Sequence, residues 1–187
     1  MPTTSPDTST AASTSAIRVD TSTDTKTDTR TDTRTVSAAR CSIARSLEVL
    51  GEKWSLLIVR EAFWGRTRFS EFRATLGVSS DILTDRLGTL VDAGVMHRVA
   101  YREAGSRERY RYELTPSGRD LTPVLAALSA WGEQHRPGLA GPSAIYRQSG
   151  TGEPVTLVFR AADGTILSDD EVEVVRGPGA LADPTSL

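Results

Sequence analysis

The amino-acid sequence predicts a mainly helical α+β protein, in which a helical domain carrying a β-hairpin is followed by a small β-rich extension. Two stretches, residues 41–92 and 115–131, repeat apolar residues at helical spacing. Between them, residues 95–114 alternate with a period near two around a turn that contains Gly105, which is typical of a β-hairpin. Short alternating runs after residue 139 predict the extension.

Composition divides the chain of 187 residues into three segments. Residues 1–38 are rich in Thr, Ser and Asp, and such a segment cannot bury enough apolar surface to offset its ordering entropy, so we expect disorder there. Residues 39–138 hold the helical and hairpin patterns and form the main domain. Residues 139–187 form the β-rich extension, whose strands are too short to be stable alone, so we expect them to dock on the main domain.

Charge and cysteine content limit the classes of protein that fit. The formal net charge of −2 hides a basic region, because residues 97–111 hold five arginines against two glutamates. The sequence has no apolar run of about 18 or more residues that would predict a membrane span, and its polar N-terminus does not resemble a secretory signal. Cys41 is the only cysteine, which excludes an internal disulfide and fits a reducing compartment. We therefore expect a cytoplasmic protein without a membrane partner.

A helix between Ser79 and Gly94 is the centre of the predicted domain. The Ser79 hydroxyl can accept a hydrogen bond from the first helical turn, and Gly94 can adopt the left-handed conformation that ends a helix. The predicted apolar stripe of this helix consists of Ile82, Leu83, Leu87, Leu90 and Val91. Its other face carries Ser80, Asp81, Thr84, Asp85 and Gly88, with Arg86 beside them.

The predicted neighbours of this helix suggest how it is presented. A helix from Arg68 to Leu76 precedes it across a tight turn at Gly77, which is helix-turn-helix geometry, and two further helices occupy residues 41–65. The hairpin follows the central helix directly and is therefore interpreted as a wing.

The last helix of the predicted domain begins at Thr115 and Pro116. Pro123 either kinks this helix or starts a new one with Thr122 as its N-cap. Three tryptophans, Trp54, Trp64 and Trp131, are interpreted as packing residues.

Contact with DNA requires cations for phosphates and short polar or guanidinium groups for base edges. The candidate residues are Arg66, Arg68, Ser79, Ser80, Thr84, Arg86, Arg102, Arg107 and Arg109. Arg86 either makes a bidentate contact to guanine or pairs with a nearby acid. Because neighbouring side chains of a strand point to opposite faces, only some of the wing arginines can face DNA, and the others face solvent.

Four sequence blocks, in order, resemble the HxlR-type transcriptional regulators, which are winged-helix proteins related to the MarR group. The blocks are CSIARSLEVLGEKW at 41–54, RFSEF at 68–72, LTDRLGTLVDAG at 83–94 and YRYELTPSGRDL at 110–121, followed by AWG at 130–132. The resemblance implies a homodimer that binds operator DNA and dimerises through the first and last helices of the domain. The corresponding positions are Leu47, Leu121, Leu125, Leu128 and Trp131.

Two departures from this family concern the DNA-binding surface. The wing tip carries Gly105-Ser106, where the family commonly has prolines, and the central helix carries Asp81 and Asp85, where the family often has Lys and Gln. An aspartate near DNA is unfavourable unless it accepts from a cytosine amine or holds an arginine. The base preference of the family therefore does not transfer to this chain.

The resemblance also suggests a regulatory role for Cys41, because some members of the family resemble thiol sensors with a cysteine at the start of the first helix. A helix N-terminus favours the reactive thiolate, and an electrophile would then be the effector. The alternative is an inert, partly buried cysteine.

Other functional classes fit the sequence less well. His97 and His135 are the only histidines and lack metal-ligand spacing, and no Gly-rich phosphate loop or Ser/His/Asp order occurs, so we expect no catalytic residue, metal or cofactor. A competing interpretation is a winged-helix protein-interaction module whose acidic extension, residues 139–187, binds a partner or a small molecule.

Overall fold

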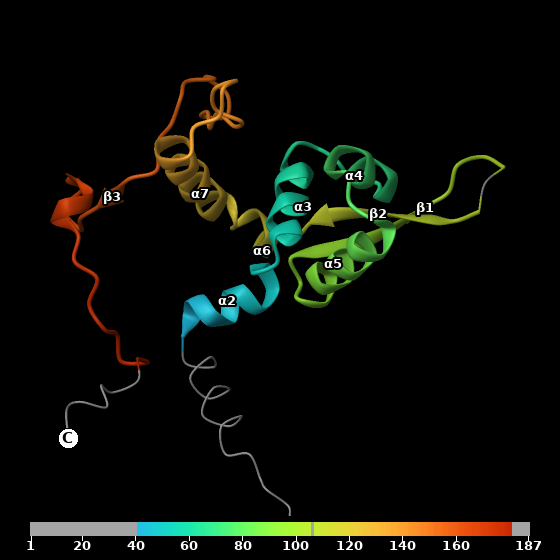
Figure 1. Cartoon of the computed structure of the whole chain (residues 1–187), viewed down its shortest axis with the longest axis horizontal. Helices are drawn as coiled ribbons and strands as arrows, with labels where there is room; N and C mark the ends of the chain where they lie inside the picture. Colours follow the sequence, from blue (N-terminus) through green and yellow to red (C-terminus); the bar gives the residue numbers. More distant parts are fainter. Residues whose placement is uncertain (1–40, 106, 181–187) are drawn as a thin grey trace, which may run out of the picture.

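The computed structural model describes residues 41–105 and 107–180 (Figure 1), so the predicted disordered segment 1–38 lies outside the described residues. The helices are α2 (Ser42–Leu50), α3 (Lys53–Phe63), α4 (Phe69–Leu76), α5 (Ser80–Asp92), α6 (Pro116–Arg119), α7 (Thr122–His135) and the 3-10 helix η1 (Asp169–Glu171). The strands are β1 (Met96–Tyr101), β2 (Arg109–Leu114), β3 (Phe159–Arg160) and β4 (Ile166–Leu167). This element order confirms the predicted mainly helical α+β fold.

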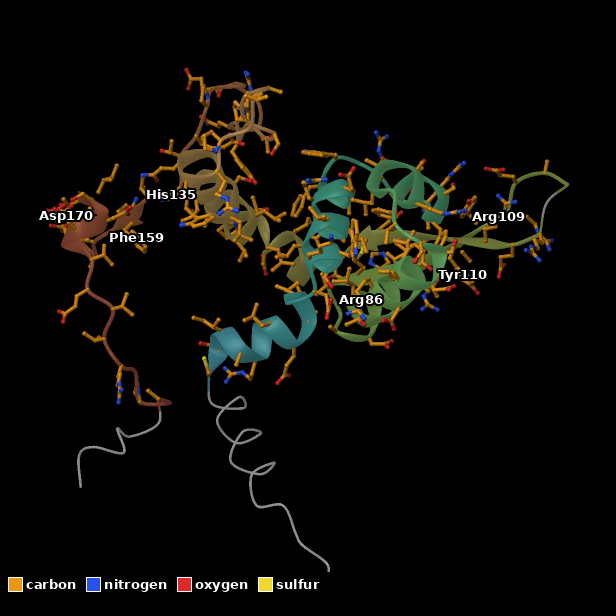
Figure 2. The ribbon with its side chains drawn as sticks, in the orientation of Figure 1. Arg86, Arg109, Tyr110, His135, Phe159 and Asp170 are labelled. Atoms are coloured by element: carbon orange, nitrogen blue, oxygen red, sulfur yellow. The ribbon has the colours of Figure 1, made fainter. Side chains whose placement is uncertain are left out.

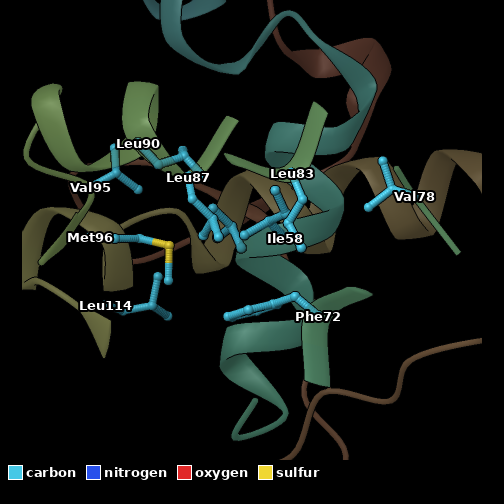
Figure 3. Close-up of a cluster of buried hydrophobic side chains, with 10 residues drawn as sticks. Ile58, Phe72, Val78, Leu83, Leu87, Leu90, Val95, Met96 and Leu114 are labelled. Atoms are coloured by element: carbon cyan, nitrogen blue, oxygen red, sulfur yellow. The ribbon is translucent and has the colours of Figure 1, made fainter. Parts of the chain in front are cut away.

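The buried core lies where α3, α4 and α5 meet the base of the β1–β2 hairpin (Figure 3). Phe72 from α4 is fully buried together with side chains of the other two helices. The remaining buried apolar residues are Ile58, Val59, Val78, Leu83, Leu87, Leu90, Val95, Met96 and Leu114. Burial of these side chains fixes α5 against α3 and leaves its other faces available to solvent.

The two ends of α5 are formed as predicted. The Ser79 hydroxyl accepts from the Ile82 N–H at 3.4 Å, and Gly94 has a φ of 70°, in the left-handed region. The predicted apolar stripe was wrong at one position, because Ile82 is 43% exposed. Consecutive residues of a helix lie about 100° apart, which places Ile82 on the flank of α5 when Leu83 points into the core.

The β1–β2 hairpin is antiparallel, with Met96 opposite Leu114 and Tyr101 opposite Arg109. A third segment joins its edge, because Arg68 forms an isolated bridge with Arg111. The Tyr112 N–H also donates to the Thr67 carbonyl at 2.7 Å. The wing is thus held directly against the start of α4.

The chain after the hairpin forms two helices rather than one kinked helix. The Thr115 hydroxyl accepts from the Gly118 N–H at 3.1 Å and donates to the Gly94 carbonyl at 2.6 Å, which ties the start of α6 to the end of α5. The second helix starts afresh with Pro123 in its first turn, but its N-cap is Leu121 rather than Thr122. The Thr122 hydroxyl instead donates to the Arg119 carbonyl at 2.8 Å.

The first part of the extension packs along α7, a helix of the main domain, as the sequence predicted, but it does not reach the buried core. This part is tied to α7 by the Ser143 N–H, which donates to the Glu133 carboxylate at 3.3 Å. Further along, β3 and β4 pair as a two-residue hairpin, and the exposed side chains of Phe159 and Ile166 show that it does not enter the core. Figure 1 shows β3 and η1 well away from α3, α4 and α5. Over the described ranges, every helix is too short or too polar to cross a bilayer.

We predict that Gly118→Ala lowers the free energy of unfolding by roughly 1–3 kcal/mol, the usual cost of overpacking a closed site. An added Cβ would lie 2.2 Å from the Val95 carbonyl oxygen and 3.0 Å from Leu114 Cδ2. Urea denaturation measures the change. The matched control is Gly88→Ala in α5, where an added Cβ meets no atom within 4 Å. It should raise the free energy of unfolding by about 0.5–1 kcal/mol, as alanine does in a helix. Equal effects of the two substitutions would contradict the packing.

The helix α4 supplies a second prediction, because Glu71 caps its start. The Glu71 carboxylate accepts from the backbone N–H groups of Arg68, at 3.0 Å, and Thr67, at 2.9 Å. These bonds, the Arg68 bond foremost, lower the pKa of Glu71 below its ordinary value of 4.5. A lowered folded-state pKa gives stability that is present above pH 4.5 and is lost as the pH falls through the folded-state pKa.

Glu71→Gln should therefore lower the free energy of unfolding by about 1 kcal/mol at neutral pH, the size of a typical helix-capping effect. The difference from the parent should shrink toward zero as the pH falls below 4.5. Urea denaturation across this pH range measures it, with Glu108→Gln on the exposed wing as the charge-matched control. A difference that does not change with pH would show that the charge of Glu71 is not involved.

Candidate nucleic-acid interface

The outward side of α5 presents short polar side chains around one exposed isoleucine. Asp81 and Thr84 are exposed, and Ser80 is half-buried. The Thr84 hydroxyl donates to the Ser80 carbonyl at 2.8 Å, so its oxygen can still accept a further hydrogen bond. Ser79 has a structural task as the N-cap, although its side chain is also exposed. Ile82 lies among these residues, although its helical spacing had assigned it to the buried apolar stripe.

Arg86 pairs with Asp85, its neighbour in sequence, through Nη2 and Oδ2. The Arg86 side chain is 24% exposed, whereas the Asp85 side chain is 66% exposed. Of the two alternatives for Arg86, this conformation shows the ion pair. The pair also gives Asp85 a physical role, because its exposed carboxylate holds the guanidinium group of the partly buried Arg86.

The start of α4 meets the wing through Arg68. Its Nη1 lies 3.1 Å from Glu103 Oε1, and its guanidinium carbon lies 5.1 Å from the centre of the Tyr101 ring. Tyr101 is directly opposite Arg109 in the hairpin. A hollow of about 580 Å³ opens here, and Arg68, Arg107 and Arg109 all line it. The structure therefore brings three of the candidate arginines together at one site.

The other candidate cations lie elsewhere. Arg66 lines a different hollow, with Ala62 and Arg119, and does not join the cluster at the start of α4. Arg102 is exposed at the end of β1. Arg111 lies 2.7 Å from Glu113 through its Nε, which reduces the positive charge that it presents. Tyr110, labelled with Arg109 in Figure 2, is 49% exposed on the wing. The sequence shows Tyr110 between Arg109 and Arg111, but the strand pattern alone did not identify Tyr110 as a candidate for contact with DNA.

The predicted dimer residues fall into two groups. Leu47, Leu128 and Trp131 are 55%, 50% and 57% exposed, respectively. Leu121 and Leu125 are partly buried and pack against the core. The packing interpretation of Trp131, and that of the half-exposed Trp64, was therefore wrong within this chain.

Two further exposed apolar residues lie on the same helices as Leu47 and Leu128. Ile43 on α2 is one turn from Leu47, and Val124 on α7 is one turn from Leu128. These two helices therefore each carry an exposed apolar stripe.

Cys41 is exposed and is the N-cap residue of α2. Its role as a thiol sensor stays a prediction. Over the described residues, no group of three or more His, Cys, Asp and Glu side chains is arranged to hold a metal ion.

Comparison with known proteins agrees with this geometry. The model of the HxlR-like helix-turn-helix family matches residues 49–139. An uncharacterized HTH-type transcriptional regulator of Mycobacterium tuberculosis, Rv3095, is 41% identical over 112 residues, which are 60% of this chain and 70% of the relative. YdeP of Bacillus subtilis, which has the same description, is 32% identical over 97 residues, 51% of this chain and 74% of its own.

Two solved structures are also similar. PA1607, described as a candidate transcription factor, has a TM-score of 0.62 and 42% identity, and the match covers 73% of this chain and 95% of PA1607. PA1374 of Pseudomonas aeruginosa has a TM-score of 0.53 and 39% identity over 75% of this chain and 95% of its own. The family match, the extent of these relatives and the helix-turn-helix of α4 and α5 agree, and the chain belongs to the HxlR-like helix-turn-helix family of transcriptional regulators.

Proposed function

We propose that the chain binds double-stranded operator DNA as a homodimer, with α5 in the major groove and the β1–β2 hairpin against the adjacent backbone. The observation that carries the proposal is the arginine cluster, in which Arg68 at the start of the helix-turn-helix lines the same hollow as Arg107 and Arg109 of the wing. A helix-turn-helix that inserts its second helix places the neighbouring wing and helix ends near phosphates.

The exposed side of α5 has suitable chemistry for base edges. Thr84 and Ser80 can exchange hydrogen bonds with bases, and Asp81 can accept from the N4 amine of cytosine. The exposed methyl groups of Ile82 can contact the methyl group of thymine, as other apolar side chains do in major grooves. Because Asp81 repels phosphates, this surface favours sites that offer a cytosine amine in register.

Arg86 would contact DNA by exchanging its ion pair with Asp85 for a contact with guanine. Its guanidinium group is held by Asp85 in the free protein, and it is already at the surface of α5. A guanine O6 and N7 pair offers two acceptors, and an exposed ion pair contributes little to stability, so the exchange costs little. Asp85 then orients the arginine rather than opposing the DNA.

The arginine cluster is suited to phosphate. Arg68 already lies against Glu103 and Tyr101, so its side chain is partly ordered before DNA arrives. Arg107 and Arg109 are exposed on the wing and line the same hollow. Each phosphate that these groups neutralise releases counterions, which makes binding sensitive to salt.

The homodimer is proposed from the exposed stripes of α2 and α7. Ile43 and Leu47 on α2, and Val124, Leu128 and Trp131 on α7, expose large apolar side chains in helical register. A two-fold dimer uses the same patch of both subunits, so a self-complementary apolar surface is sufficient. Two copies of α5 would then read half-sites about 10 bp apart in an approximate inverted repeat.

One prediction of the proposed function concerns DNA binding. Arg107→Ala/Arg109→Ala should weaken binding to a fragment of the upstream region of the gene, because phosphate contacts are lost. The slope of log Kobs against log salt should fall by about 0.9 for each contact removed. Fluorescence anisotropy titrations at several salt concentrations measure both quantities.

The matched control is Arg160→Ala on β3, which removes one exposed arginine far from α5 and should leave affinity and salt slope unchanged. Absence of salt-dependent binding in the parent protein would instead favour the interaction module. Equal losses in the control would remove the arginine cluster as the contact site.

Another prediction of the proposed function concerns the dimer. Leu128→Glu should convert the dimer to monomers, because a two-fold interface would bury the new carboxylate twice and without a partner. Analytical ultracentrifugation measures the mass, and the monomer should lose at least tenfold in operator affinity as its second half-site is lost.

Ile82→Glu is the control, since it places the same side chain at a similarly exposed apolar position on α5. It should stay dimeric and lose DNA binding through charge repulsion. A Leu128→Glu protein with the parent mass would show that α7 is not in the interface.

A further inference from the structure

The segment that follows α7 lies beside this helix (Figure 1). Side chains of the segment and of α7 line a cleft between the two. Its volume is about 560 Å³. The α7 wall is formed mainly by small side chains, Ala126, Ser129 and Ala130, and the wall of the extension by Ile145, Val155 and Leu157. Because the α7 side chains are small, the extension can lie close to α7 without filling the space between them.

Helical geometry separates this cleft from the surface proposed for the dimer. With 3.6 residues per turn, Ala126, Ala130 and Glu133 share one side of α7. Val124 and Leu128 lie about 160° around the helix from Ala126, on the opposite side. A second copy that covers the Leu128 side therefore leaves the cleft accessible.

The apolar walls of the cleft are partly exposed to water. Ile145, Val155 and Leu157 are about half-exposed or more, although they lie on a concave surface. Removing such surface from water is favourable in proportion to the apolar area covered. An apolar molecule seated in the cleft would therefore be stabilised by three branched side chains at once.

The polar groups of the cleft limit the charge of its occupant. The hydroxyl oxygens of Ser129 and Tyr146 are 3.5 Å apart, which is long for a hydroxyl hydrogen bond, so either can turn to a ligand. The only charged side chain in the lining is Glu133, whose carboxylate accepts from the Ser143 N–H at 3.3 Å. A negative charge there disfavours anions, and an uncharged molecule avoids the cost of desolvation.

We propose that this cleft is a binding site for an uncharged, mainly apolar organic molecule that carries one hydrogen-bonding group. The cleft has the size, the apolar walls and the few convergent polar groups that are typical of small-molecule sites. One wall of the site lies on α7, and the other lies in the extension beyond residue 139, where the match to the family model ends. The inference does not depend on DNA binding.

The test uses a pair of fluorescent probes that differ in charge. N-phenyl-1-naphthylamine is neutral and has one N–H donor, and 1-anilinonaphthalene-8-sulfonate is the same aromatic amine with an added sulfonate. Titrated into the full chain, the neutral probe should give a saturable signal with one site per protomer. Its Kd should be at least tenfold lower than that of the sulfonate.

Two variants should fill the cleft, Ala126→Leu and Ala130→Leu, and each should weaken binding of the neutral probe at least tenfold. The matched control is Ala127→Leu, which adds the same side chain to an exposed position of α7 outside the cleft. It should leave the Kd within twofold of the parent value. Circular dichroism shows whether each variant keeps its helices, and two filling variants are used so that misfolding of one does not end the test.

Three outcomes would overturn the proposal. The first is a signal from the neutral probe that does not saturate. The second is equal loss of binding in Ala127→Leu and Ala130→Leu, which would place the probe on another surface of α7. The third is binding of the sulfonate as tight as that of the neutral probe, which would exclude the assigned ligand chemistry. Failure of DNA binding alone would leave each of these measurements unchanged.

Discussion

The burial of one side of α5 is the constraint on which the rest of the structure depends. Leu83, Leu87 and Leu90 are fully buried against the residues of α3 and α4, which fixes the rotation of α5 about its own axis. Helical periodicity then determines what the other sides present: Asp81, Thr84 and Asp85 face outward. If α5 rotated by one residue, it would move a leucine into solvent and a polar group into the core. The hydrophobic core thus decides which residues can meet another molecule.

The local parts of this arrangement could be predicted from the sequence because they depend on nearby residues. The cap at Ser79 and the left-handed Gly94 both act within one helical turn of their partners. The alternation of residues 95–114 was likewise enough for the hairpin. Ile82 shows the limit of this reasoning, since a residue on the flank of a stripe is buried only where a neighbouring element covers it. Whether a neighbouring element covers it depends on tertiary packing, which a periodic pattern does not encode.

The candidate site could be predicted only in part, for the same reason. Position on α5 followed from periodicity, but the meeting of Arg68 with the wing depends on contacts between residues far apart in sequence. Arg68 pairs with Glu103, and its backbone bridges to Arg111. Arg66, only two residues away, lines another hollow. The exposure of side chains on α7 could not be predicted for a different reason. Apolar spacing indicates that Leu128 and Trp131 are to be buried, but it does not say whether the same chain or another one covers them.

The helix α7 is the part of the molecule in which these constraints meet. Leu121, immediately before it, and Leu125 pack against the core, Leu128 and Trp131 are exposed on a second side, and Ala126 and Ala130 line the cleft on a third. Since a helix is stiff, its three sides cannot reorient independently. A displacement of α7 caused at the cleft would change the angle at which its exposed stripe meets a second copy. In the proposed homodimer, the spacing of the two α5 helices would depend on that angle, because each α5 is packed against its own core. In that homodimer, α7 would connect occupancy of the cleft with the separation of the two α5 helices.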